Sequence, residues 1–160
     1  MALSHRQLCY EAAEWLLSQP WCDCSCFELK VGRGFADAIG ISKPRAKTHR
    51  VTIIEVKRTR SDLLADLRSS KYMKYEGQST HCYFAGTPEA FGNRTKAQIL
   101  VDFKNRNLPD HWGILELGPK GRVKCHRTAK AHSTTTSTRV RALTRKIAKS
   151  LIYRALQGKL

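Results

Sequence analysis

The chain has 160 residues, of which 41% are hydrophobic and 8% aromatic. This length and composition suit one folded domain with a real hydrophobic core and exclude a wholly disordered chain. The formal net charge of +16 and the isoelectric point near 10 indicate a polyanionic partner. Nucleic acid is the first expectation, and an anionic membrane surface is the competing one.

The excess of positive charge is concentrated in the C-terminal part. Residues 117–160 contain twelve Lys or Arg and no acidic residue, which leaves 17 basic against 13 acidic residues in the first 116. No apolar run approaches the roughly 20 residues that span a bilayer, and the N-terminal sequence lacks the apolar core of a signal peptide. We therefore expect a cytoplasmic protein that does not enter a membrane.

Hydrophobic periodicity predicts helices and strands in mixed order along the chain. The expected elements are a helix at 4–18, strands at 26–31, 35–41 and 51–59, a helix from 61, a strand at 80–88, a helix and loop at 95–110, a hairpin at 112–127 and a basic helix after the polar linker 132–138. This order predicts an α/β fold with a four-stranded mixed central sheet flanked by helices. We expect two parts, a domain at 1–131 and the linker with its C-terminal helix at 132–160.

The strand VTIIEVKRT at 51–59 carries two charges in an otherwise apolar run. Alternation places Val51, Ile53, Glu55 and Lys57 on one face, so the two charged side chains are neighbours. Charges on a buried strand need a local partner or a function. A plain cross-strand salt bridge is the simpler alternative.

Asp37 is the acidic residue of the preceding strand, FADAIGI. If the two strands pair as a hairpin, Asp37 and Glu55 approach closely enough to share a divalent cation, with Lys57 beside them. Mg²⁺ held by two carboxylates can activate a water and stabilise charge on a phosphodiester, which suits the basic composition. An ordinary turn or edge-strand acid remains the alternative for Asp37.

The combination of Asp37 with EVK at 55–57 resembles the PD-(D/E)XK nuclease superfamily. The ordered series FADAIGI, VTIIEVKRTRSDLLADLRSSKYMKY and CYFAGTP is similar to the MmcB-like group of DNA-repair nucleases and related phage proteins. The resemblance covers roughly residues 5–127 and implies a restriction-endonuclease-like fold. Ala36 stands where the proline of the superfamily's name would be.

The resemblance also implies roles for individual residues in DNA hydrolysis. It implies that Asp37, Glu55 and the Val56 carbonyl bind Mg²⁺ or Mn²⁺, that Lys57 is the catalytic lysine, and that Glu11 is the acid from the first helix. A helix-border glutamate such as Glu11 is equally often just solvated.

A separate set of residues is expected to bind DNA, largely through its phosphates and without reading sequence. Three match basic or aromatic positions near the family's site, and five form the polar face of the C-terminal helix. The set is Arg33, Lys71, Tyr75, Arg139, Arg141, Arg145, Lys146 and Lys149. Tyr75 is also a candidate for plain packing of its helix. Cutting both strands of a duplex calls for a homodimer.

Two other classes of function remain open. One is a non-catalytic DNA-binding or repair accessory module on a nuclease-like fold. The other is a zinc or iron–sulfur site in the CDCSC sequence at 22–26, although an extended segment would leave these cysteines as small hydrophobes on one strand face.

Overall fold

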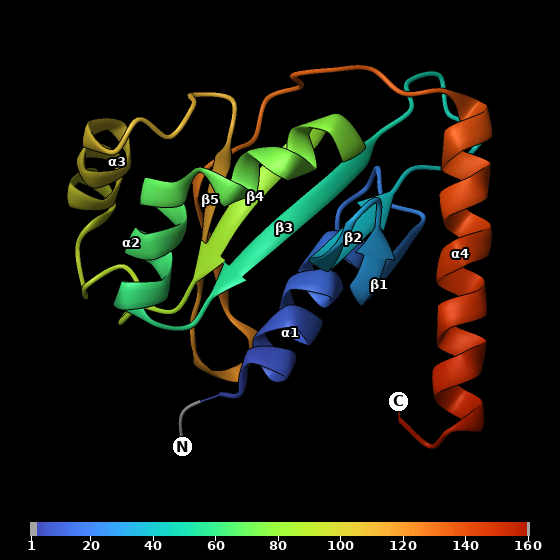
Figure 1. Ribbon diagram of the computed structural model, residues 1–160, viewed down its shortest axis with the longest axis horizontal. Coiled ribbons are helices and arrows are strands. Elements are labelled where there is room, and N and C mark those ends of the chain that lie inside the picture. The colour runs from blue at the N-terminus through green and yellow to red at the C-terminus, as the bar shows by residue number, and fades with distance from the viewer. Residues whose placement is uncertain (1–2, 160) are drawn as a thin grey trace.

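The computed structural model describes residues 3–159, in which six strands form one mixed sheet in the order β1-β2-β3-β4-β5-β6. Helices cover the sheet, and α4 stands at the β1 end of the molecule (Figure 1). The α-helices are α1 His5–Leu17, α2 Arg60–Ser69, α3 Lys96–Asn105 and α4 Ser137–Leu156, and the 3₁₀ helices are η1 Lys71–Gln78 and η2 Pro119–Gly121. The strands are β1 Cys24–Val31, β2 Gly34–Ile41, β3 Val51–Lys57, β4 His81–Gly86, β5 Gly113–Leu117 and β6 Val123–Arg127.

The sheet combines antiparallel and parallel pairs. The first three strands form an antiparallel meander, β3, β4 and β5 run parallel, and β6 returns antiparallel to β5. This confirms the mixed α/β, restriction-endonuclease-like arrangement. The predicted hairpin, β5 and β6, extends the four expected strands to a six-stranded sheet, because the crossover through α3 places β5 directly beside β4.

Each face of the sheet has its own apolar core. On one face α1 packs over residues such as Ala38, Ile54 and Tyr83. On the other, the helical segments after β3 pack over Phe84 and Trp112, whose rings lie 5.1 Å apart between centroids. Because Ile54 and Glu55 are consecutive, the Glu55 side chain belongs to the second face.

The C-terminal helix belongs to the second core. Val140, Leu143 and Ile147 on α4 are buried in the same cluster as Phe84, and α4 packs against β1. The predicted amphipathic helix is thus present, and its apolar stripe is covered by the sheet. Within residues 3–159, no helix is long and apolar enough to cross a membrane.

The start of α2 differs from the prediction by two residues. Thr59, not Ser61, is the N-cap, and its Oγ1 accepts a hydrogen bond from the Asp62 N–H at 3.2 Å. A capping hydroxyl satisfies one of the free N–H groups of the first turn. The helix therefore begins almost directly after β3 ends, which brings its side chains close to the charged end of that strand.

We predict that Ile147→Ala destabilises the protein by about 2–5 kcal/mol, because it leaves a cavity between α4 and the sheet. Ile152→Ala is the matched control on the same helix. Ile152 is 61% exposed whereas Ile147 is 2% exposed, so the control should change the free energy of unfolding by no more than about 0.5 kcal/mol. Urea denaturation measures both. Equal small effects would show that α4 does not pack on the sheet.

Candidate active site

The site forms where β2 and β3 separate. Their backbone pairing runs from Ile41 and Val51 to Ala38 and Ile54 and ends there. At the next position the Asp37 side chain takes over, and its Oδ2 accepts a hydrogen bond from the Val56 N–H at 2.8 Å. This bond fixes the carboxylate between the two strands, which pair antiparallel as the predicted hairpin.

The neighbouring strand β1 is distorted at the same level. Glu28 has φ of 50°, in the left-handed region that non-glycine residues seldom adopt. It lies between the paired residues Phe27 and Leu29, and opposite Asp37, without a partner of its own in the ladder. Asp37 thus has no regular backbone partner in β1 or β3, so its carboxylate is available to bind other groups.

Lys57 is held by two carboxylates on the adjoining part of the sheet. Its Nζ lies 2.6 Å from Glu55 Oε1 and 2.9 Å from Asp66 Oδ2. All three side chains are at most 15% exposed. Glu55 and Lys57 therefore do form the ion pair of the simpler alternative, but in a buried cluster that includes a third group, Asp66 of α2.

Glu55 is under electrostatic stress. Burial and repulsion by Asp37 raise the pKa of Glu55, and the opposing effects of Lys57 and Tyr75 offset this only in part. Burial lowers the pKa of Lys57, but Glu55 and Asp66 more than offset it, so its pKa is raised. The Lys57 ammonium therefore remains charged.

The donor set of this cluster fits a divalent cation. Glu55 Oε2 is buried and has no hydrogen-bond partner. The carboxylate to which this oxygen belongs is repelled by the charge of Asp37. Two repelling carboxylates with a free buried oxygen match the oxygen ligands that Mg²⁺ or Mn²⁺ prefers. Asp37 and Glu55 could thus hold the metal, and Val56, the third predicted ligand, contacts Asp37 through its N–H.

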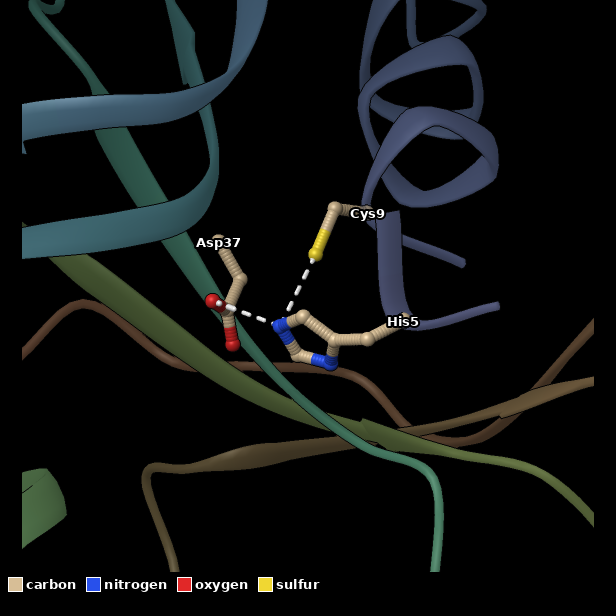
Figure 2. Close-up of side chains that lie close together, drawn as sticks. All are labelled: His5, Cys9 and Asp37. Carbon is tan, nitrogen blue, oxygen red and sulfur yellow. Dashed lines mark hydrogen bonds and ion pairs between the residues drawn. The ribbon is translucent and has the colours of Figure 1, made fainter. Parts of the chain in front are cut away.

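The helix α1 brings His5 and Cys9, not Glu11, to Asp37. His5 Nε2 lies 3.3 Å from Asp37 Oδ1 and 3.4 Å from Cys9 Sγ, and Figure 2 shows the three side chains converging. Hydrogen bonding to Asp37 raises the pKa of His5, although burial opposes it. The spacing i, i+4 places His5 and Cys9 on one helix face.

The expected role of Glu11 does not fit its position. Glu11 lies on a different side of α1, where its carboxylate faces the backbone of Gly121. Burial and the neighbouring Glu14 raise the pKa of Glu11, against the opposing effect of its hydrogen bond with the Gly121 backbone. Its helix position, six residues after His5, turns it about 120° away from the site.

Tyr75 was predicted to contact DNA, and the structure corrects this. Tyr75 is 3% exposed, and its hydroxyl donates a hydrogen bond to the Phe35 carbonyl at 2.8 Å. Burial and the charge of Glu55 raise the pKa of Tyr75. Tyr75 therefore packs inside the protein beside Glu55, and its ring is not available to stack on a base. Arg33 and Lys71 are exposed.

The basic face of α4 lies on the surface. Its five predicted residues, Arg139, Arg141, Arg145, Lys146 and Lys149, are all exposed. Only Arg139 has a hydrogen-bonding partner for its side chain within residues 3–159, Gln78. At the other end of α4, Arg154 donates to the Glu28 carbonyl at 2.9 Å. The helix thus connects the Gln78 turn to the strand that adjoins Asp37.

The cysteines of the CDCSC sequence pack as small side chains. Cys22 Sγ donates to the Cys24 carbonyl, and burial raises the pKa of Cys22 and Cys24 to about 11. Cys24 and Cys26 lie in β1, beside Thr144 and Ser150 of α4. Between residues 3 and 159, one group of three or more His, Cys, Asp or Glu side chains lies close enough together to hold a metal. It consists of His5, Cys9 and Asp37.

No family model matches this chain, and no curated protein matches it. Among solved structures, it is similar to SfsA of Pyrococcus furiosus, which was determined in complex with Ca²⁺. The identity is 12% and the TM-score 0.29, and the match covers 77% of this chain. The match spans 61% of SfsA, less than two thirds of its length.

We predict that Lys57→Met lowers the free energy of unfolding by about 3–5 kcal/mol, because it leaves Glu55 and Asp66 buried without a counter-charge. Adding Glu55→Gln should recover part of the loss. Arg94→Met is the control, since Asp102 keeps two other arginines and Arg94 is 41% exposed. It should cost no more than about 1 kcal/mol. Denaturant unfolding of all three variants measures these changes in the free energy of unfolding. A loss of stability in Lys57→Met no larger than that in Arg94→Met would contradict a buried charge cluster.

Proposed function

We propose that the protein is a metal-dependent DNA endonuclease, in which Asp37 and Glu55 hold Mg²⁺ or Mn²⁺ for phosphodiester hydrolysis. The observation that carries this proposal is the buried Oε2 of Glu55, which has no hydrogen-bond partner and whose carboxylate is repelled by that of Asp37. Such an arrangement is costly unless a cation compensates it. The family resemblance adds a setting in DNA repair, recombination or phage DNA processing.

Each residue of the cluster has a distinct task under this proposal. A bound divalent cation supplies charge stabilisation at the phosphate and lowers the pKa of a water ligand. Asp37 is oriented for binding by the Val56 N–H, and Glu55 by Lys57. Lys57 carries a positive charge at the site, where it can act on the attacking water or on a phosphate oxygen.

DNA binding is assigned to the exposed basic residues of α4. Arg141, Arg145, Lys146 and Lys149 have no ion pairs among residues 3–159, so their charges are available to phosphates. Arg154 anchors the same helix beside Glu28, near the site. DNA lying along α4 would thus approach Asp37. A cut through both strands would further require a homodimer.

A non-catalytic DNA-binding module is the second candidate, and one observation favours it. Lys57 already neutralises Glu55 at 2.6 Å and contacts Asp66 at 2.9 Å. A lysine in this position balances part of the negative charge without a metal. The two candidates differ in whether divalent metal and Asp37 matter to the protein's action on DNA.

We predict that Glu55→Gln and Asp37→Asn each lower the rate of DNA cleavage by roughly 100-fold or more, as expected when a group that stabilises transition-state charge is lost. Labelled duplex, single-stranded, forked and four-way DNAs with Mg²⁺ or Mn²⁺ are the substrates. Glu14→Gln and Asp110→Asn are matched controls, because both carboxylates are exposed. The controls should cleave at the wild-type rate.

The outcomes of this assay separate the two candidates. Cleavage by wild type that is lost in both site variants but kept in both controls supports the nuclease. Binding of DNA by every variant, equally with and without a chelator and with no cleavage on any substrate, supports the binding module. The site variants retain their buried volume, so a thermal melt checks that folding is unchanged.

We also predict that Arg141→Gln/Arg145→Gln weakens DNA binding and makes it less dependent on salt. Each phosphate contact removed should lower the slope of log affinity against log salt concentration by about 0.9. Lys96→Gln/Lys104→Gln is the control, since it removes the same charge from α3 on the opposite side of the molecule (Figure 1). Fluorescence anisotropy at several salt concentrations measures both. An equal fall in slope for the two variants would indicate a general charge effect rather than binding along α4.

A further inference from the structure

The contacts around His5 are unusual for hydrogen bonds. His5 Nε2 is the atom nearest both Asp37 Oδ1, at 3.3 Å, and Cys9 Sγ, at 3.4 Å. A neutral imidazole nitrogen either donates or accepts, so it cannot donate to the carboxylate and accept from the thiol at once. The distance to Asp37 is also long for a charge-assisted bond, which is about 2.7–2.9 Å.

The same distances match the edges of a metal coordination shell. Bond lengths of about 2.3 Å to sulfur and 2.0–2.2 Å to nitrogen and oxygen place tetrahedral ligands about 3.3–3.6 Å apart. The three donor atoms all lie within 4.8 Å of one another. Their side chains point to a common centre from α1 and β2 (Figure 2).

We propose that His5, Cys9 and Asp37 bind a divalent transition metal that prefers nitrogen and sulfur ligands, with Zn²⁺ as its representative. On binding, the Cys9 thiol proton passes to solvent and the thiolate sulfur bonds to the metal, with no change of oxidation state. Water would be able to reach a bound metal, because the His5 side chain is 47% exposed.

The surroundings of the three residues support a cation. Glu28 and Glu55 add their negative charge to that of Asp37 at both His5 and Cys9. The Val56 N–H holds the second oxygen of Asp37, as outer hydrogen bonds commonly orient metal-binding carboxylates. Histidine and cysteine four residues apart on a helix present both ligands from one face.

One consequence rests on the proposed function. Asp37 is common to this site and to the Mg²⁺ site with Glu55, so a metal at His5 and Cys9 competes for the same carboxylate. Zn²⁺ should therefore inhibit DNA hydrolysis. The softer ligands His5 and Cys9 favour Zn²⁺ over Mg²⁺ at their side of Asp37.

Co²⁺ binding to chelator-treated protein, followed by absorption spectroscopy and calorimetry without DNA, tests the site directly. We expect one Co²⁺ per chain, a thiolate-to-cobalt charge-transfer band, and displacement by Zn²⁺ but not by Mg²⁺. Cys9→Ser should abolish the band, and His5→Ala should weaken binding at least about tenfold.

Three control variants make the result specific. Cys125→Ser removes an exposed thiol and Cys24→Ser removes one beneath α4, and both should retain the band. Glu55→Gln should also retain it while losing any nuclease activity, so failure of one proposal is distinguishable from failure of the other. Absence of the band in wild type, its loss in Cys24→Ser, or its persistence in Cys9→Ser would overturn the site.

Discussion

The hydrogen bond from the Val56 N–H to Asp37 is the interaction on which the candidate site depends. Where β2 and β3 part, a side-chain oxygen replaces the backbone acceptor. The bond ends the hydrogen-bond ladder between β2 and β3, and it also orients the Asp37 carboxylate. With the left-handed Glu28 on the other side, Asp37 stands outside regular pairing, which leaves its second oxygen for His5 or a cation.

The charge distribution separates two tasks in space. A small acidic cluster lies in a protein of net charge +16, and its carboxylates are largely buried at the end of the sheet. The exposed arginines and lysines of α4 attract polyanions, whereas the buried carboxylates attract cations. Under the proposed function, a phosphate group brought along the helix would meet buried carboxylates whose negative charge a bound metal would compensate.

Much of the fold and the centre of the site followed from periodicity, and the remainder depended on packing. Strand alternation was sufficient to predict that Glu55 and Lys57 are neighbours on β3 and that Asp37 lies on the adjacent strand, because neighbours in a hairpin are fixed by register. Asp66 was missed because a single acid within an amphipathic helix carries no sign that it is buried. His5 and Cys9 were missed because their face of α1 becomes part of the site only once the helix is seated on the sheet.

Asp66 explains how one lysine can suit both a resting cluster and a metal site. Lys57 lies between Glu55 and Asp66. A cation that takes up Glu55 leaves Lys57 its contact with Asp66, so the ammonium remains paired and stays in place. Without Asp66, a metal bound at Glu55 would lie close to the Lys57 ammonium, and the buried ammonium would have no carboxylate partner. Under the proposed function, the carboxylate from α2 would therefore let the EVK strand bind a cation while Lys57 stays paired.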